Sequence, residues 1–253
     1  MAEGSGSWNS PELLFALVVA SANDTKCRSI GIPAYLFASE AGIDGTIIRA
    51  GSELYLSSQA GLLVIDTTPD GYTDHYPTTW KGFKMWRRML KERGVREEDV
   101  YPLINPPANP SGSKPPLVHT ASEAREIVNM AKREKWEEFY IVSHPIHILR
   151  SFACVVTAIV KEQLPIRVFA HTGPPESGWR LETNLNQGLS TGIILGDGTD
   201  GELARLKKIY NNDLDIAPAE TILKYIKWRD SDGKFPFPVS TQRERSFRLE
   251  PKS

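Results

Sequence analysis

The residues best suited to carry chemistry form one short cluster in the middle of the chain. Ser143, His144, His147 and Arg150 follow an apolar run at 139–142 and begin a segment with helical periodicity. The free backbone N–H groups and the dipole of a helix start favour a bound anion. Arg150 could form paired hydrogen bonds to a phosphate or carboxylate, and a histidine could act as a general acid or base. The structural alternative is that His144 caps the helix, His147 is a partly buried polar residue and Arg150 is solvated or ion-paired.

The hydrophobic pattern predicts a fold that brings strand ends and helix starts together. Short apolar runs, most without polar alternation, predict strands buried on both faces. They lie at 13–20, 62–65, 100–104, 139–142 and 166–170. Helical patterns lie at 49–59, 78–93, 120–136 and 145–163. This alternation predicts an α/β fold, a Rossmann-like three-layer sandwich with a mostly parallel sheet.

Two of the predicted helices have clear signals at their N-termini. Thr120 and Glu123 form a capping box, in which the Thr hydroxyl accepts a hydrogen bond from an early backbone N–H and the Glu side chain reaches back. Pro145 suits a first helical position because its missing N–H would have no partner there. In the helix at 78–93, Trp86 is expected in the core and the basic residues on a solvated face.

Further polar side chains follow the predicted strands. In an open parallel sheet, ligands bind beyond the carboxyl ends of the strands. The residues expected at that edge are Asn23 and Asp24 after the first run, Asp66 and Thr67 after the second, and His119 and Thr120 before the third helix. The pattern predicts a ligand site at this edge, with Ser143 and Thr120 as hydrogen-bond donors and Glu123 or Asp66 as orienting carboxylates.

Length and composition favour an ordinary globular protein. The chain has 253 residues and 40% hydrophobic residues, enough for one large domain or a domain with an added subdomain. The expected organisation is a flexible lead-in at 1–10, the Rossmann-like domain at 11–178, a helical extension or cap at 179–230 that packs on the same domain, and a tail at 231–253.

Charge and cysteine content narrow the partners and the compartment. The 30 basic and 31 acidic residues are interspersed, so nucleic acid is not the expected partner. Cys27 and Cys154 are far apart, which favours a reducing compartment, and we expect a cytoplasmic protein. The apolar run at 13–20 has no preceding Lys or Arg and is too short to cross a bilayer, so no membrane insertion is expected.

Metal and dinucleotide motifs are weak. The five histidines show no H-x-x-x-H or H-E-x-x-H spacing, so no metal site is expected. Residues 196–201 fit G-x-G-x-x-G, but the acids at 197, 200 and 202 would repel a pyrophosphate. The sequence therefore leaves the cofactor open, and it leaves the oligomeric state open as well.

Three motifs in this order resemble the YdcF-like family, also called the ElyC/SanA/YdcF domain, which is of largely unknown function. They are Arg49-x-x-x-Glu53-Leu54-Tyr55, Thr120-x-x-Glu123-Ala124 and Ser143-x-x-x-His147-x-x-Arg150, and the resemblance extends over about 13–173. It implies a Rossmann-like fold with a cleft lined by Arg49, Thr120, Glu123, Ser143, His147 and Arg150. The chain departs from the family at 20–24 and 66–68, where side chains replace the family's glycines.

The expected function is a small-molecule enzyme that acts on a phosphate- or carboxylate-bearing, nucleotide-like substrate by hydrolysis or group transfer. The predicted catalytic residues are His147, Arg150, Glu123 and Asp66. The predicted substrate- or anion-binding residues are Asn23, Asp24, Arg49, Thr67, His119, Thr120, Ser143 and His144. The alternatives are a non-catalytic metabolite- or nucleotide-binding protein and an S-adenosylmethionine-binding transferase.

Overall fold

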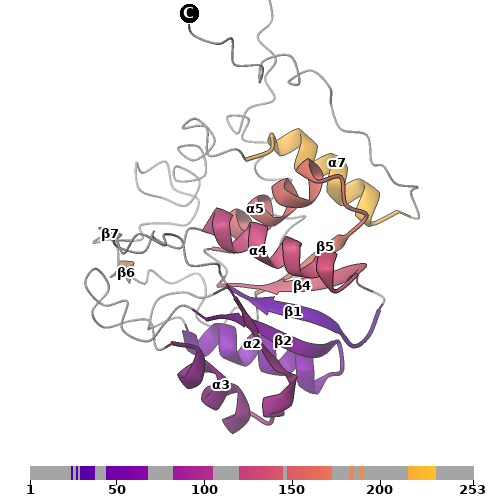
Figure 1. Cartoon of the computed structure of the whole chain (residues 1–253). Helices are drawn as coiled ribbons and strands as arrows, with labels where there is room; N and C mark the ends of the chain where they lie inside the picture. The colour runs from indigo at the N-terminus through magenta and orange to yellow at the C-terminus, as the bar shows by residue number, and fades with distance from the viewer. Residues whose placement is uncertain are drawn as a thin grey trace, which may run out of the picture.

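The computed structural model describes residues 24, 27, 29–37, 44–67, 82–104, 120–144, 147–172, 183–184, 189–190 and 216–231 (Figure 1). In chain order, the elements are β1 (Ile32–Leu36), α2 (Asp44–Leu56), β2 (Ala60–Asp66), α3 (Gly82–Glu92), the 3-10 turn η1 (Glu97–Asp99), β3 (Val100–Leu103), α4 (Thr120–Arg133), β4 (Glu138–Val142), α5 (Ile148–Lys161), β5 (Arg167–His171), β6 (Thr183–Asn184), β7 (Leu189–Ser190) and α7 (Ala219–Arg229). Strands β6 and β7 form a separate antiparallel pair.

The five other strands form one parallel sheet in the order β3-β2-β1-β4-β5. The central strand β1 pairs with β2 on one side and with β4 on the other. After β3, the chain crosses to β4 through α4, so the strand order reverses between β1 and β4. This arrangement confirms the predicted α/β, Rossmann-like fold. Ligands of such sheets bind where the order reverses, beyond the carboxyl ends of the strands.

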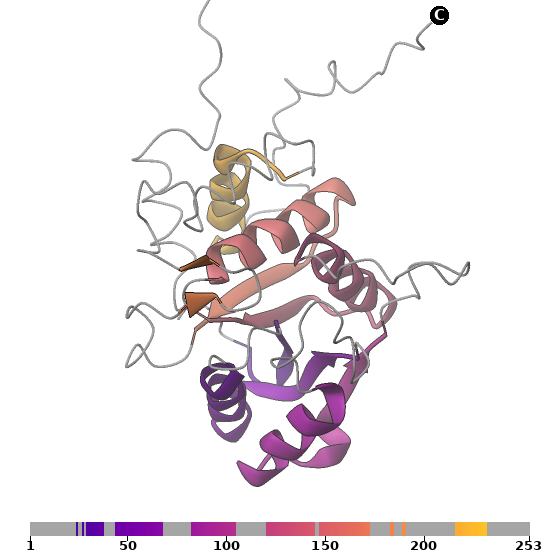
Figure 2. The same cartoon turned by 90° about the vertical axis from the view of Figure 1, so that its left-hand side faces the viewer.

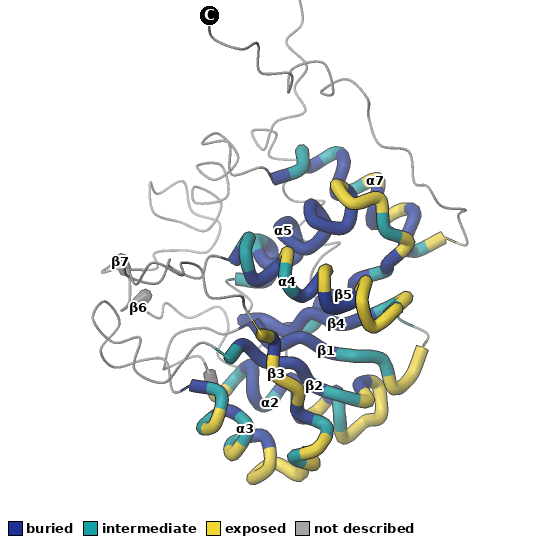
Figure 3. The backbone as a smooth tube through the Cα atoms, in the orientation of Figure 1, coloured by how far each residue is buried: buried dark blue, intermediate teal, exposed yellow. Residues whose placement is uncertain are grey.

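Helices cover both faces of the sheet (Figures 1 and 2). Helices α2 and α3 pack on one face, α4 and α5 on the other, and α7 packs against α5. Side chains along β1 point alternately to the two faces of the sheet. Leu36 faces α2 and α3, whereas Tyr35 and Phe37 face α4 and α5. Figure 3 shows buried backbone through the strands and α5, and exposed residues along the outer side of α3.

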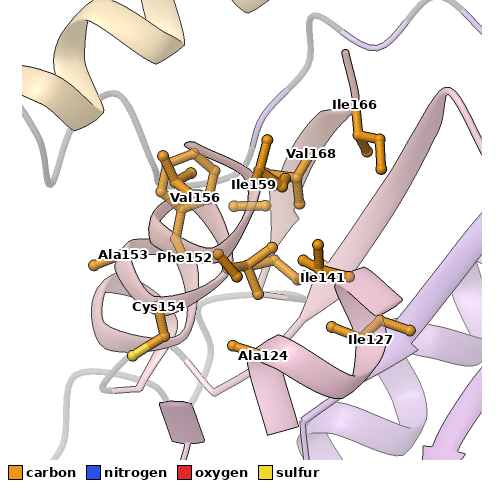
Figure 4. Packing of buried hydrophobic residues seen from close by; sticks show 14 of the residues in the cluster. Ala124, Ile127, Ile141, Phe152, Ala153, Cys154, Val156, Ile159, Ile166 and Val168 are labelled. Carbon is orange, nitrogen blue, oxygen red and sulfur yellow. The ribbon is translucent and has the colours of Figure 1, made fainter. Parts of the chain in front are cut away.

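Helix α5 is buried around almost its whole circumference. Every residue at 151–160 is buried, because the helix lies among α4, β5 and α7. Phe152, Val156 and Ile159 pack with Ile141 of β4 and Val168 of β5 (Figure 4). A helix that is apolar all round belongs in a protein interior. This packing fixes the position of the helix start that carries His147 and Arg150.

The outer edge of β5 is closed by side chains of α7. The Tyr225 hydroxyl accepts a hydrogen bond from the Val168 N–H at 2.8 Å and donates to the Ile166 carbonyl at 2.8 Å. Arg229 Nη1 donates to the Val168 carbonyl at 2.9 Å, and the Asp24 N–H donates to the Ala170 carbonyl at 2.8 Å. These contacts satisfy backbone groups that an open edge strand would offer to another chain.

Most predicted elements are confirmed, with shifted ends. The runs at 62–65, 100–104, 139–142 and 166–170 correspond to β2, β3, β4 and β5, and the four helical patterns correspond to α2, α3, α4 and α5. Helix α2 begins at Asp44, five residues before the predicted start, and α5 begins at Ile148 rather than Pro145. The residue before the first turn of α5 is His147, and its side chain makes no cap hydrogen bond.

The central strand β1 was not among the predicted strands. Its sequence, Ile-Pro-Ala-Tyr-Leu, carries a proline, which normally argues against a central strand because it cannot donate to a ladder. Pro33 lies where the pairing with β2 shifts register, between Ile32 and Pro33, and one residue before the pairing with β4 begins at Ala34. The strand predicted at 13–20 lies outside the described residues. In the part of the chain that the structure describes, no helix has the length and apolar character needed to span a membrane.

Candidate functional site

Three polar side chains meet where the N-termini of α4 and α5 lie beside the end of β4. Arg150 Nη1 donates to Thr120 Oγ1 at 3.0 Å, and Thr120 Oγ1 lies 3.0 Å from His147 Nε2. Thr120 is buried, whereas His147 and Arg150 are partly exposed. We call these three residues the Arg–Thr–His cluster. It unites a predicted anion contact, a predicted hydroxyl donor and a predicted general acid or base.

The chain leaving β4 determines where His147 lies. The His144 carbonyl accepts hydrogen bonds from the His147 N–H at 2.8 Å and the Ile148 N–H at 2.9 Å, which closes a turn directly before α5. The next contact, from the Ser151 N–H to the His147 carbonyl at 3.0 Å, begins the helix ladder. A tight turn on a buried helix therefore holds His147 at the carboxyl edge of the sheet.

The end of β1 supplies an aromatic wall. Phe37 is fully buried, and its ring meets the His147 ring edge-on with the centroids 6.0 Å apart. The Phe37 N–H donates to the Val142 carbonyl at 2.9 Å, which ties the end of β1 to the end of β4. The Arg–Thr–His cluster therefore lies next to the point where the strand order reverses.

Two predicted carboxylates lie on the same face of the sheet, around Tyr35. The Tyr35 hydroxyl donates to Glu123 Oε1 at 2.6 Å. Burial raises the pKa of Tyr35 well above its usual value, and the nearby charges of Glu123 and Asp66 raise it further. Asp66 ends β2, and both carboxylates are buried. Glu123 and Asp66 therefore both lie near the buried hydroxyl of Tyr35 at the edge of the sheet.

The hydroxyl of Thr120 does not act as the predicted helix cap. Thr120 is already the first residue of α4, and its hydroxyl contacts Arg150 and His147. The Thr120 hydroxyl therefore contacts side chains at the start of α5 instead of a backbone N–H at the start of its own helix. A local sequence motif cannot reveal this, because the two partners lie 27 and 30 residues away.

Ser143 and His144 are buried after β4. The Ser151 hydroxyl donates to Ser143 Oγ at 3.5 Å, and the Ser143 N–H donates to the His171 carbonyl at 3.2 Å. His144 is only 1% exposed, and burial lowers its pKa to about 4. His144 is therefore neutral at neutral pH, which removes the electrostatic basis for an anion contact by this side chain.

Other predicted site residues lie elsewhere. Arg49 is on α2, which covers the opposite face of the sheet, and its Nε lies 4.0 Å from Glu53 Oε1. Asp24 lies beside β5 and forms a buried ion pair with Arg229. Thr67 donates its hydroxyl to the Leu103 carbonyl at 2.8 Å and so joins β2 to the end of β3. Asn23 and His119 are outside the described residues.

Three of these predicted site residues thus have positions or partners apart from the Arg–Thr–His cluster. Arg49 is separated from the Arg–Thr–His cluster by the sheet, Asp24 has a structural cationic partner, and Thr67 binds a backbone carbonyl. Conversely, Tyr35 and Phe37 contact the site and were missed, because the strand that carries them was not predicted. The aromatic pair two residues apart is the signal that could have found them.

No group of three or more His, Cys, Asp or Glu side chains that could hold a metal ion occurs among the described residues. Comparisons with models of known protein families, with curated proteins and with solved structures found no match to this chain.

The buried histidine predicts a specific dependence of stability on pH. Because the pKa of His144 is about 4 in the folded protein, the unfolded chain binds more protons between about pH 4 and 6.5. The free energy of unfolding should therefore fall as the pH falls through this window. Burial also lowers the pKa of His171, which adds to the loss in the same direction.

Urea unfolding at about pH 7.5 and pH 5 measures this effect. We expect His144→Gln to lose less free energy of unfolding between the two pH values than the wild type does, since glutamine does not titrate. An equal loss in the wild type and in His144→Gln would show that His144 does not contribute.

Proposed function

We propose that the protein is an enzyme that binds a phosphate- or carboxylate-bearing small molecule at the Arg–Thr–His cluster and catalyses hydrolysis or group transfer there. The observation that carries this proposal is the pair of 3.0 Å contacts through which Arg150, Thr120 and His147 share one hydroxyl oxygen. A guanidinium, a hydroxyl and an imidazole within hydrogen-bond reach of one another form a common arrangement for acid–base chemistry on an anionic substrate.

Several features favour an anion beside Arg150. The guanidinium is permanently charged, and its fork of donors fits a phosphate or a carboxylate. The N-termini of α4 and α5 both lie at this point, and each adds partial positive charge. The fold adds a general reason, because parallel sheets of this order bind ligands where the strand order reverses.

The buried carboxylates support a nucleotide-like ligand. Glu123 and Asp66 would repel an anion placed directly on them, so the anionic group belongs on the Arg150 side of the site. Carboxylates are good acceptors for hydroxyl groups. We therefore expect a ligand with an anionic group, which binds beside Arg150, and a sugar whose hydroxyl groups are oriented by Glu123 and Asp66.

A thermal-shift screen tests the binding site. The ligands are nucleotides, nucleotide sugars, sugar phosphates, S-adenosylmethionine and nicotinamide cofactors. A ligand at about 100 times its dissociation constant stabilises the folded state by about 2.7 kcal/mol, which gives a clear shift of the unfolding midpoint. We expect at least one anionic ligand to raise the unfolding midpoint of the wild type but not that of Arg150→Ala. The control is Arg133→Ala, which removes an exposed arginine of α4 and should keep the shift. A shift that survives in Arg150→Ala would move the site elsewhere.

A kinetic comparison separates catalysis from binding alone. With a substrate of the class that the screen identifies, His147→Ala should lose about 100-fold or more of the rate, the usual contribution of general acid–base catalysis. The wild-type rate should also change along a limb between about pH 5 and 8. Full activity in His147→Ala would eliminate its catalytic role, and binding without turnover would favour a metabolite-binding protein.

We also propose that the protein is a member of the YdcF-like family and that it is located in the cytoplasm. The family resemblance is supported by Thr120, Glu123, His147 and Arg150 lying at one edge of a Rossmann-like sheet. The cytoplasmic location is supported by Cys27 and Cys154, which are both free thiols.

A further inference from the structure

The hydrogen-bond capacity of Thr120 restricts the state of His147. A threonine hydroxyl has one proton and two acceptor positions. Arginine can only donate, so the contact from Arg150 Nη1 at 3.0 Å occupies one acceptor position of Thr120 Oγ1. The hydroxyl keeps its proton and one further acceptor position for His147, whose Nε2 lies 3.0 Å away.

Burial determines the direction of the second contact. Thr120 is 7% exposed, and a buried hydroxyl proton normally has an acceptor. Among the described residues, the acceptor within hydrogen-bond distance of this hydroxyl is His147 Nε2. An Nε2 that accepts a proton carries none itself, so the neutral ring must hold its proton on Nδ1. Free histidine in water favours the opposite tautomer, with the proton on Nε2.

We propose that Thr120 is a positioning residue that holds neutral His147 in the Nδ1–H tautomer and relays protons between His147 and the ligand. The relay rests on the function proposed above, whereas the tautomer is a property of the free protein. Since Thr120 Oγ1 occupies the position next to Nε2, a proton that His147 exchanges through this nitrogen passes through the Thr120 hydroxyl.

The relay balances in both directions. When His147 acts as a base, the O–H bond of an attacking water or hydroxyl breaks and its proton goes to Thr120 Oγ1, while the original Thr120 proton goes to His147 Nε2. The nucleophile forms its bond to the phosphoryl or glycosyl centre as the bond to the leaving oxygen breaks. The imidazolium then returns its proton through Thr120 to that oxygen, and both residues recover their starting states.

The tautomer can be read directly by NMR on protein with ¹⁵N-labelled histidine. Two-bond ¹⁵N–¹H correlations at about pH 8, where an ordinary histidine is neutral, identify which ring nitrogen is protonated. His147→Gln assigns the signals by their loss. In the wild type, we expect an unprotonated Nε2 and a protonated Nδ1 for His147.

Three substitutions at Thr120 test whether its hydroxyl determines the tautomer of His147. Thr120→Val keeps the shape but removes the hydroxyl, and it should shift His147 toward the Nε2–H tautomer. Thr120→Ser should restore the Nδ1–H form, and Thr120→Ala repeats the deletion with a smaller side chain if valine impairs folding. A wild type with the proton on Nε2, or a Nδ1–H tautomer that persists in Thr120→Val or Thr120→Ala, would overturn the proposal. Because these spectra need no ligand, a failed ligand screen would leave their result unchanged.

Discussion

Replacing Arg229 with methionine is expected to lower the free energy of unfolding by about 3–5 kcal/mol. The Arg229 and Asp24 side chains are 1% and 3% exposed and form an ion pair. Arg229 also donates to the Val168 carbonyl, and its guanidinium lies 5.0 Å from the centre of the Phe169 ring. Methionine would leave the Asp24 carboxylate buried without this cation, which is the costly way to break a buried pair.

Urea unfolding of three variants isolates the contribution of the buried pair. Lys227→Met, an exposed position on the same helix, makes the same change of charge and side chain and should alter stability by less than about 0.5 kcal/mol. Adding Asp24→Asn to Arg229→Met should recover part of the loss, because it removes the uncompensated charge. Equal effects of Arg229→Met and Lys227→Met would contradict the structural role of this pair.

Replacing Trp86 with alanine is expected to destabilise the protein by about 3–5 kcal/mol. Trp86 is fully buried on α3, where it belongs to the core between α2, α3 and the sheet. Its loss removes a large apolar surface and leaves a cavity, since the surrounding helices and strands relax only partly.

Lys84→Ala on the same helix is the matched control, because Lys84 is exposed. Thermal unfolding followed by circular dichroism should give a clearly lower midpoint for Trp86→Ala and a nearly unchanged one for Lys84→Ala. A small effect of Trp86→Ala would mean that α3 contributes little to the core of this face.

The sequence predicted four strands of the parallel sheet and missed the central strand, β1. The apolar runs in β2, β4 and β5 stand out, because strands buried on both faces carry few polar residues. In β1, Pro33 interrupts the run; it lies beside a register irregularity in the pairing with β2 and just before the pairing with β4 begins at Ala34. That irregularity depends on the partner strand and has no local signal.

Part of the site was also predictable from the sequence. Short-range spacing placed His147 and Arg150 at one helix start, and the rule for parallel sheets placed Thr120 near them. The roles of Arg49 and Asp24 could not be judged from the sequence. Arg49 depends on which face α2 covers, and Asp24 depends on a partner 205 positions later in the chain, Arg229.

Titration with adenosine 5′-monophosphate, followed by ¹⁵N–¹H NMR, most directly tests whether the Arg–Thr–His cluster binds an anionic, hydroxyl-bearing ligand. We predict saturable shifts that concentrate at the backbone amides of Thr120, His147 and Arg150 and at the Arg150 side chain, and that disappear in Arg150→Ala. Shifts that concentrate on the basic residues of α3, or that persist in Arg150→Ala, would contradict the proposed site.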